Sequence, residues 1–307
     1  AQPLESDVDK IASHLNAAKQ PIIIAGQGVL SSGAEPELLM LSEKTGIPIV
    51  TTLMSQELAF SGHDNVKGMI GTQGNYASTL LSDQADVVLI LGSRISNRIH
   101  GSIEDYLSGA CVIHVDIDDN VFNRFITPEI TVHSDVKFFL QALIPQVNAS
   151  EYLLWNKEFS ELKEVEIENV LTKSLSRTEG PITMVEFMHA LSEKTQKDSV
   201  LITDVGEHQM IASKIYQPKH AHSLVTSGGY GTMGFGLPAA IGAKIAAPDH
   251  QAILIAGDGG FQMTLQELQV LSQEALDIKI VILNNIRLGM IQFWQDVFYA
   301  QHESYSK

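Results

Sequence analysis

A carboxylate and two asparagines follow two apolar runs in the second half of the chain. Asp258 lies among glycines directly after Ile253–Ala256, and Asn284 and Asn285 follow Ile278–Leu283. Carboxylate and amide oxygens are ligands that Mg²⁺ accepts, and the backbone N–H groups of a glycine turn before a helix attract phosphate oxygens. Either group alone could be an ordinary turn. Together, each at the end of a predicted strand, they predict a site for Mg²⁺ and a diphosphate.

The order Gly-Asp-Gly followed by Asn-Asn resembles the signature of thiamine-diphosphate enzymes. The resemblance implies that Mg²⁺ is held by the Asp258 carboxylate, the Asn285 side chain and the main-chain carbonyl of Arg287. The Arg287 side chain has no task in this interpretation. Three glycines beside the carboxylate would let the backbone approach the diphosphate: Gly257, Gly259 and Gly260.

Two upstream segments resemble further parts of the same cofactor site. Thr226–Ala239 is similar to the loop that shapes the bound cofactor, with Met233 as an apolar wedge and the Gly231 carbonyl as a hydrogen-bond acceptor. Core packing is the alternative for Met233. Asp204–Met210 is similar to the turn that holds the diphosphate from the other side, and it contributes Gly206, Glu207 and His208.

Glu207 departs from the family pattern, which usually has glutamine at this position. A carboxylate beside a diphosphate is unfavourable unless it points away or is protonated, so the role of Glu207 as a ligand is in question. The residues expected at thiamine diphosphate are Gly206, Glu207, His208, Gly231, Met233, Gly257, Asp258, Gly259, Gly260, Asn285 and Met290.

The segment Gly289–Tyr299 narrows the resemblance to one branch of the family. It is similar to a recurring string of the acetohydroxyacid synthase (acetolactate synthase) large subunit, in which Gly-Met is followed by Trp and then Phe-Tyr. Met290 and Trp294 have helical spacing and share one helix face, so both can face the cofactor. The resemblance implies that Met290 and Trp294 line the substrate pocket, whereas core packing is the alternative.

The first half resembles the middle domain of this branch, which carries FAD in the biosynthetic enzymes. Glycines, arginines and carboxylates at its predicted strand ends stand in the order of the family's flavin contacts. Dinucleotides bind at the carboxyl ends of parallel strands in such domains. The residues expected at FAD are Gly26, Gly28, Gly71, Gly92, Arg94, Arg98, Asp116 and Asp135. Ser96 and Asn97 replace the usual acidic pair, so a middle domain without flavin is the alternative.

By this resemblance the chain is part of a transferase of branched-chain amino acid biosynthesis that uses thiamine diphosphate and Mg²⁺. Pyruvate would be decarboxylated, and its two-carbon unit would condense with a second 2-oxo acid, pyruvate or 2-oxobutyrate. The family glutamate that activates the cofactor belongs to a separate N-terminal domain, so no catalytic acid or base is assigned in this chain. Expected partners are further copies of the chain, in a homodimer or homotetramer, and a regulatory small subunit.

Two alternatives to this function stay open. Another thiamine-diphosphate enzyme, such as pyruvate oxidase, a 2-oxo-acid decarboxylase or sulfoacetaldehyde acetyltransferase, would share most of these motifs. The other alternative is a non-catalytic cofactor-binding module. Because the chain begins at Ala1 and its last stretch, Phe298–Lys307, lacks a finishing element, we expect a fragment that is inactive by itself.

The apolar pattern predicts an α/β protein with two doubly wound parallel sheets. In the first half, runs rich in β-branched residues predict strands at Ile22–Ala25, Ile47–Thr51, Val87–Leu91 and Val112–Asp116. In the second half, strands are predicted at Val200–Thr203, Ala252–Ala256 and Ile278–Asn284, with helices that include Met184–Lys194, capped by Thr183, and Thr264–Glu274. These elements predict a Rossmann-like middle domain at 1–147, a helical linker at 148–180 and a cofactor domain at 181–307.

The composition limits the partners. The 307 residues carry 20 basic and 36 acidic side chains, a formal net charge of −16, which repels polyanions such as nucleic acid and anionic membrane surfaces. The apolar runs are far shorter than the ~20 residues of a membrane span, and no signal peptide is recognisable, so we expect a cytoplasmic protein. The single cysteine, Cys111, lies in an apolar run and is expected to be a small core residue.

Overall fold

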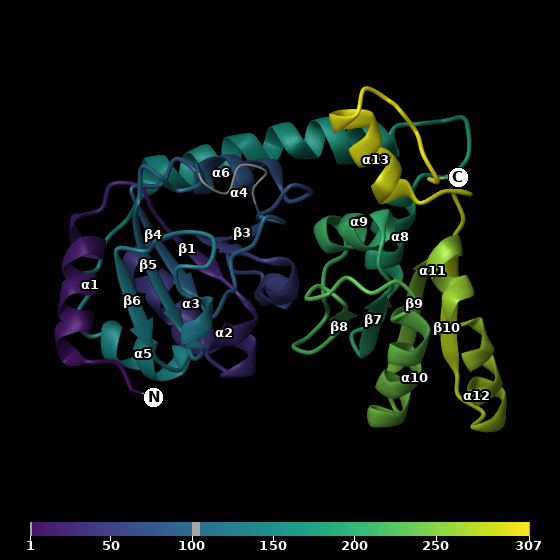
Figure 1. The fold of residues 1–307 in the computed structure, drawn as a ribbon, viewed down its shortest axis with the longest axis horizontal. Helices are drawn as coiled ribbons and strands as arrows, with labels where there is room; N and C mark the ends of the chain where they lie inside the picture. Colours follow the sequence, from purple (N-terminus) through teal and green to yellow (C-terminus); the bar gives the residue numbers. More distant parts are fainter. Residues whose placement is uncertain (1, 100–104, 307) are drawn as a thin grey trace. The chain divides into compact units, whose positions relative to one another are not determined.

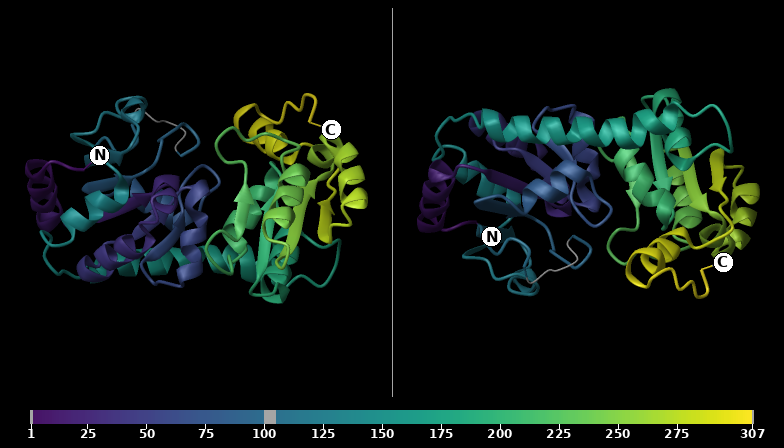
Figure 2. Two further views of the ribbon diagram at one scale, coloured as in Figure 1. Left: turned by 90° about the horizontal axis from the view of Figure 1, so that it is seen from below. Right: turned by 90° about the horizontal axis from the view of Figure 1, so that it is seen from above.

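The computed structural model describes residues 2–99 and 105–306, which divide into two compact units after Thr172 (Figure 1). The division falls inside the predicted linker 148–180. Each unit contains one parallel sheet with helices on both of its faces (Figure 2). The predicted fold class, two parallel-sheet α/β domains, is therefore confirmed.

The first unit has six parallel strands in the order β3-β2-β1-β4-β5-β6. Its elements are α1 (Glu5–Ala17), β1 (Pro21–Ala25), α2 (Gln27–Ser31), α3 (Glu35–Thr45), β2 (Ile49–Thr51), η1 (Leu53–Ser61), β3 (Val66–Met69), α4 (Tyr76–Ser82), β4 (Val87–Leu91), β5 (Cys111–Asp116), η2 (Asp119–Val121), β6 (Ile130–His133), α5 (Val136–Leu143), α6 (Leu153–Glu166) and η3 (Ile167–Thr172).

Alternate residues of the central strands of this sheet belong to two separate cores. In β1, Ile23 and Ala25 pack with α1, α2, α3 and α5 on one face. Ile22 and Ile24 pack with α4 and α6 on the other face. Because successive side chains of a strand point to opposite faces, a strand covered on both sides needs apolar residues at nearly every position. This requirement explains the continuous apolar runs from which the central strands are predicted.

The second unit has four parallel strands in the order β10-β9-β7-β8. Its elements are α7 (Lys173–Leu175), α8 (Met184–Lys194), β7 (Ser199–Thr203), α9 (Glu207–Ile215), β8 (Leu224–Thr226), α10 (Gly236–Ala246), β9 (Gln251–Gly257), α11 (Asp258–Met263), η4 (Leu265–Glu267), α12 (Leu268–Gln273), β10 (Ile278–Leu283) and α13 (Gly289–Phe298). One face of the sheet packs against α8 and α9, and the other packs against α10 and α12.

Three strands are missing from the sequence prediction: β3, β6 and β8. All three lie at the edges of their sheets, where one side of the strand has no neighbour within the described residues. In β6, Ile130 and Val132 are buried whereas Thr131 and His133 are exposed. A search for continuous apolar runs passes over β6 because only one of its faces is buried, and β3 and β8 have only four and three residues.

The predicted linker is helical and belongs in part to the first unit. Trp155 and Phe159 of α6 are 2% and 1% exposed and pack into the core beside α4. The indole N–H of Trp155 donates to the carbonyl of Pro21 at 2.9 Å. Because Trp155 and Phe159 complete a core of the first unit, the first half of the predicted linker is part of that unit and not a free connection.

Two helices predicted in the second unit are present in the structure, the second of them with a break and an additional helix before it. Thr183 caps α8 as predicted, and its hydroxyl accepts from the Glu186 N–H at 3.2 Å. The predicted helix Thr264–Glu274 is present as η4 (Leu265–Glu267) and α12 (Leu268–Gln273), but helical structure begins already at Asp258 and is interrupted at Thr264, whose φ is −134°. The Thr264 hydroxyl donates to the Gly234 carbonyl at 3.0 Å, which ties this residue to a neighbouring loop instead of a helix.

Cys111 packs against the core of the first unit, as the sequence predicts, but it is not fully buried. It is the first residue of β5 and is partly buried. Burial of the thiol, together with the neighbouring Glu129 carboxylate, raises the pKa of Cys111 to about 11. Across residues 2–99 and 105–306, no helix combines the length and apolar composition needed to cross a membrane.

Candidate functional site

The second sheet places β7 and β9 side by side, although β8 lies between them along the chain. From β7 the chain passes to β8 on one side, and from β9 it passes to β10 on the other side. In sheets of this kind, ligands bind in the crevice between the two loops that diverge at the carboxyl ends of the strands. The diverging loops here begin at Asp204 and Asp258.

The strand register brings three predicted segments to the same edge of this sheet. Thr203 pairs with Ile255 of β9, and Gly257 pairs with Leu283 of β10. The turn after Thr203, the Asp258 carboxylate and the asparagines after Leu283 therefore emerge next to one another. The fold accounts for a site made of residues that lie far apart in the sequence.

Asp204 organises this edge, although it is absent from the site residues that the sequence predicts. Its side chain is almost completely buried, and its carboxylate accepts from the Gly234 N–H at 3.0 Å and from the Val205 N–H. Burial raises its pKa, against the opposing effect of hydrogen bonds from Val205, Gly234, Phe235 and Gly236. The carboxylate thus holds the loop that carries Met233. An aspartate directly after a buried strand is the sequence signal that could have identified it.

Two glycines are required by the position of Asp204. A Cβ on Gly260 would lie 2.5 Å from Oδ2 of Asp204, and a Cβ on Gly236 would lie 2.9 Å from its Cβ. Neither position can take a larger residue without moving the buried carboxylate. The sequence predicts Gly260 as a point where backbone approaches a diphosphate, and the structure gives it a packing reason as well.

His208 carries an unpartnered polar atom into this crevice. It lies in the first turn of α9, is 4% exposed and is hydrogen-bonded to the backbone of Asp204. Within the described residues, its Nε2 atom is buried and has no hydrogen-bond partner. Its Cε1 atom is 3.3 Å from the position that a Cβ on Gly257 would occupy. A buried ring nitrogen without a partner is uncommon and points to a ligand at this place.

We expect His208 to make the second unit sensitive to acid. Burial lowers the pKa of His208 to about 4, against smaller opposing effects of Asp204 and Asp258. In the unfolded chain the ring protonates near pH 6.5, so the unfolded state binds the proton first as the pH falls. The stabilisation that depends on neutral His208 should therefore be fully present above pH 6.5. As the pH falls towards 4, the free energy of unfolding should decrease by up to about 3 kcal/mol.

Urea titrations at pH 7.5 and 4.5 of wild type and the His208→Gln variant measure this effect. The variant should lose this component of the pH dependence, and His302→Gln, at an exposed position, should keep it. Equal pH dependence in wild type and His208→Gln would contradict the assignment.

The predicted metal ligands lie at the ends of β9 and β10. Asp258 begins α11 and is half-buried, and no hydrogen bond to its carboxylate is present within the described residues. The Asn285 Oδ1 atom accepts from the Arg287 N–H at 3.3 Å, which folds the chain back so that both residues belong to one tight turn. The Arg287 guanidinium donates to Gln292 at 2.7 Å and is exposed, which agrees with a role for its carbonyl alone.

The structure answers the question about Glu207. Its carboxylate accepts from the Nδ2 group of Asn285 at 3.3 Å and lies against Gly289, the first residue of α13. Carboxylates are favourable at the N-terminus of a helix because of its unpaired N–H groups and dipole. The Glu207 side chain therefore points towards the 285–289 turn, where it orients the amide of Asn285.

Met233, the predicted apolar wedge, lies in the loop before α10. Met233 is half-buried, and its terminal methyl lies 3.6 Å from the position of a Cβ on Gly259. Leu288 approaches the same position to 3.2 Å, so Gly259 lies between two apolar side chains. Gly231 is exposed and has a φ of 65°, in the left-handed region.

α13 presents Met290 and Trp294 without burying either in a core. All ten residues of this helix are described and none is fully buried. Trp294 stacks on Phe298 with the ring centroids 4.6 Å apart. Gly289 lies against Glu207 and Asn285, so the residue that follows it, Met290, is next to the candidate site. Trp294 lies one helical turn farther along α13. The pocket role of both residues stays a prediction.

Glycines predicted for FAD have a packing explanation in the first unit. β1 and β4 flank the point where the strand order of this sheet reverses. The Gly28 N–H donates to the Gly92 carbonyl at 2.8 Å, and a Cβ on Gly28 would lie 2.6 Å from the Gly92 Cα. A Cβ on Gly26 would likewise collide with Gly92 and Ser93. The contact between two loops requires these glycines whether or not a dinucleotide binds.

Among the remaining FAD candidates, the two aspartates accept hydrogen bonds from the backbone, whereas the two arginines are exposed. Asp135 caps α5 by accepting from the Lys137 N–H at 2.9 Å, and Asp116 accepts from the Asp118 N–H at 3.0 Å. Gly71 lies against the backbone of Arg98, whose carbonyl oxygen would be 3.2 Å from a Cβ added at this glycine. The side chains of Arg94 and Arg98 are exposed. The two arginines are therefore the candidates that keep their side chains available to a ligand.

Both units match known protein families. The family described as "Thiamine pyrophosphate enzyme, central domain" matches residues 8–143. The family described as "Thiamine pyrophosphate enzyme, C-terminal TPP binding domain" matches residues 204–307, the part that contains the crevice between β7 and β9. The first match lies in the first unit and the second match in the second unit.

Several curated proteins are similar to the chain over nearly its whole length. The acetolactate synthase large subunit of Lactococcus lactis is 37% identical over 304 residues, which are 98% of this chain and 52% of that protein. The probable acetolactate synthase large subunit of Methanococcus aeolicus is 35% identical, over 96% of this chain and 51% of that protein. The acetolactate synthase isozyme 1 large subunit of Escherichia coli K12 is 34% identical, over 97% and 52%. The chain spans about half the length of these relatives.

Proposed function

Since this chain belongs to the thiamine pyrophosphate enzyme family, we propose that the crevice between β7 and β9 binds the diphosphate of thiamine diphosphate through Mg²⁺. The observation that carries this proposal is the buried, unpartnered Nε2 atom of His208 at the carboxyl ends of the two strands. A bound diphosphate would favour the protonated ring, whose Nε2–H group could then donate to a phosphate oxygen. The N-terminus of α9, which begins at Glu207, adds backbone N–H groups that favour an anion.

The donors on the opposite side of the crevice suit Mg²⁺. The Asp258 carboxylate, the Asn285 amide oxygen and the Arg287 carbonyl are hard oxygen ligands, and diphosphate oxygens and water would complete the shell. Asn285 can present its oxygen because Glu207 accepts from its amide nitrogen at 3.3 Å. Asp258, Asn285 and Arg287 therefore fit the ion, and Glu207 acts as a positioning residue for Asn285.

The rest of the proposed site orients the cofactor and excludes water. When bound, thiamine diphosphate supplies the electron sink that decarboxylation of a 2-oxo acid requires. Met233 and Leu288 flank Gly259 and would form the apolar support beneath the bound cofactor. The Gly231 carbonyl would accept from the aminopyrimidine, and Met290 and Trp294 would line the substrate pocket. The catalytic acid or base is not assigned to this chain.

We propose that the whole protein is an acetolactate synthase catalytic subunit. The names of the similar proteins support this interpretation, as does the string Gly289–Tyr299. Pyruvate would then be decarboxylated and condensed with pyruvate or 2-oxobutyrate, in branched-chain amino acid biosynthesis in the cytoplasm, with a regulatory small subunit as partner. Another enzyme of the same family that acts on 2-oxo acids is the competing proposal.

Product analysis distinguishes these activities. A protein that joins this chain to an N-terminal thiamine-diphosphate domain of the family, incubated with pyruvate, thiamine diphosphate and Mg²⁺, should form acetolactate. Release of acetaldehyde or acetyl phosphate without acetolactate would contradict the synthase assignment. Mixtures of pyruvate and 2-oxobutyrate would then give the preference for the second substrate.

Flavin binding by the first unit is an alternative that a spectrum can decide. Its support is the reversal of strand order between β1 and β4, together with the exposed side chains of Arg94 and Arg98. Against it, the glycines of the two loops pack on each other and Asp135 caps a helix. Protein incubated with FAD and passed through gel filtration would carry the flavin absorption only if this unit binds it.

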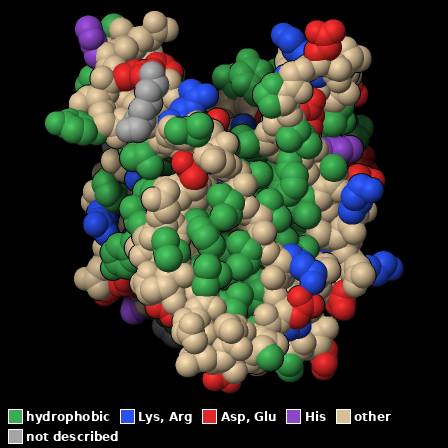
Figure 3. Space-filling view, turned by 90° about the vertical axis from the view of Figure 1, so that its right-hand side faces the viewer, with side chains coloured by type: hydrophobic (Ala, Val, Ile, Leu, Met, Phe, Trp, Pro, Cys, Tyr) green, Lys and Arg blue, Asp and Glu red, His purple; other side chains and the backbone are tan. Residues whose placement is uncertain are grey.

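A homodimer or homotetramer is proposed from the surface of the second unit. Figure 3 shows hydrophobic side chains gathered over this side of the molecule. Large apolar side chains that are at least one third exposed occur on successive elements of the unit, namely Met263, Leu265, Leu268, Ile282, Ile291 and Phe293. Contiguous apolar area of this kind marks a surface that another chain segment covers.

A further inference from the structure

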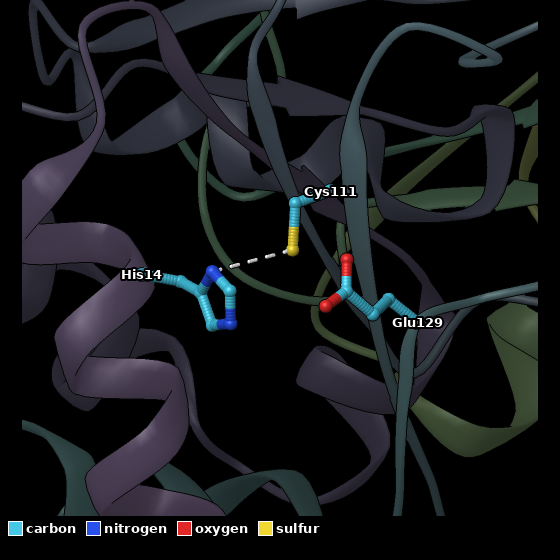
Figure 4. Close-up of side chains that lie close together, drawn as sticks. All are labelled: His14, Cys111 and Glu129. Atoms are coloured by element: carbon cyan, nitrogen blue, oxygen red, sulfur yellow. Dashed lines mark hydrogen bonds between the residues drawn. The ribbon is translucent and has the colours of Figure 1, made fainter.

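Three side chains of different chemistry meet in the first unit, whereas the cofactor crevice belongs to the second unit. Among the described residues, His14, Cys111 and Glu129 form a group whose ligand atoms all lie within 4.8 Å of one another. The Sγ atom of Cys111 is 3.6 Å from Nδ1 of His14. Figure 4 shows the imidazole and the carboxylate on either side of the sulfur, brought together from α1, β5 and the residue before β6.

Each of these side chains is attached to a firmly packed piece of backbone. His14 lies between Ile11 and Leu15 of α1, which are 0% and 2% exposed. Cys111 precedes the buried strand residues of β5, and the Glu129 N–H donates to the Val112 carbonyl at 2.8 Å. Ligand side chains on packed elements are held close to their productive geometry, as a binding site requires.

We propose that His14, Cys111 and Glu129 bind one zinc ion. In tetrahedral coordination with bond lengths of ~2.3 Å to sulfur and ~2.0 Å to nitrogen, the two ligand atoms lie about 3.5 Å apart. The observed separation of 3.6 Å is close to that value. A thiolate, an imidazole and a carboxylate form a mixed set that suits Zn²⁺ and is a poor match for Mg²⁺ or Ca²⁺.

Charge and access also agree with a divalent ion. The thiolate and the carboxylate together carry two negative charges that Zn²⁺ would neutralise, and the thiol proton would pass to the buffer on binding. Glu129 is exposed, so the ion can enter from solvent, and water can take the fourth position. Lys10 and Asp86 act on Cys111 with opposite signs, so their charges partly offset one another.

The ion would fasten the N-terminal helix to the sheet. His14 is 97 residues from Cys111 in the sequence, so an unfolded chain would have to close a long loop to present both ligands, and the ion would bind almost only to the folded unit. Zinc should therefore raise the thermal midpoint of the first unit. This effect is independent of thiamine diphosphate, because the cofactor crevice belongs to the second unit.

Cobalt spectroscopy of the full chain tests the proposal sharply, because Cys111 is its single cysteine. Co²⁺ added to the protein in excess Mg²⁺ should produce a thiolate-to-cobalt charge-transfer band and the visible bands of a four-coordinate ion, and Zn²⁺ should remove both. In Cys111→Ser the charge-transfer band should vanish, and the affinity for Zn²⁺ should fall by about 100-fold or more.

Two further variants and one control complete the test. His14→Ala and Glu129→Gln should each weaken Zn²⁺ binding by about tenfold or more, and His302→Ala, at an exposed histidine of the second unit, should leave it unchanged. Absence of the thiolate band in the wild type overturns the proposal, and this result does not depend on whether any variant folds. Zinc affinity within threefold of wild type in a folded Cys111→Ser variant, checked by circular dichroism, overturns it as well.

Discussion

Replacing Asp258 by alanine should abolish magnesium-dependent binding of thiamine diphosphate while the second unit stays folded. Asp258 is half-buried at the first position of α11, and no hydrogen bond holds its carboxylate within the described residues. Its removal should therefore change the free energy of unfolding by less than about 1 kcal/mol. Binding should suffer far more, because the proposed ion would lose its only negatively charged protein ligand. We expect the affinity for thiamine diphosphate to fall by about 100-fold or more.

Isothermal calorimetry with thiamine diphosphate and Mg²⁺ measures this loss. Asp296→Ala, at an exposed aspartate of α13, is the matched control and should bind as the wild type does. Thiamine monophosphate, which lacks the second phosphate group, should bind weakly to every variant. Unchanged binding in Asp258→Ala would remove the metal assignment, whatever the family of the protein.

Replacing Asp204 by alanine should destabilise the second unit more than any other single change at the site. Its almost fully buried carboxylate accepts from Gly234 and Val205, and it fills the space left by Gly236 and Gly260. Alanine would leave buried N–H groups without a partner and create a void. Unsatisfied buried donors are expected to contribute ~1–3 kcal/mol each, so we expect a loss of about 3–5 kcal/mol. The thermal midpoint of the unit should fall by roughly 10 °C or more.

Thermal unfolding followed by circular dichroism, with and without thiamine diphosphate and Mg²⁺, checks this prediction. Asp249→Ala, at an exposed aspartate in the turn before β9, serves as the control for loss of a carboxylate. Asp204→Asn keeps the volume and one acceptor oxygen, so it should fall between wild type and alanine. A stability of Asp204→Ala within about 1 kcal/mol of wild type, on the scale of ordinary surface substitutions, would contradict the capping role.

The central strands and the cofactor class could be predicted from local sequence. Val87–Leu91 and Ala252–Ala256 are apolar throughout because each strand is buried on both faces, and such a run is visible without any structure. The motif around Asp258 is equally local, because a strand, a turn and a helix start form one continuous stretch. Edge strands such as β6 could not be predicted in this way, since only half of their residues are buried.

Pairings between distant residues could not be predicted. Asp204 caps a loop 30 residues away, and Glu207 orients the amide of Asn285, 78 residues away. Nothing in the residue types at either end announces the partner. His208 illustrates the same limit, because its sequence context predicts a position near a diphosphate, whereas only the structure shows that its Nε2 atom is buried without a partner among the described residues.

The sequence by itself determined the alternation of strands and helices and the family, and it yielded the proposed set of residues for Mg²⁺ and a diphosphate. Tertiary structure alone decided that Glu207 points towards Asn285, that the glycines after β1 and β4 pack on one another, and that Cys111 meets His14 and Glu129. The physical reason is the range of the interactions. Backbone propensity and burial act within one element, whereas a hydrogen bond or a metal ligand set depends on which elements the folded sheet brings side by side.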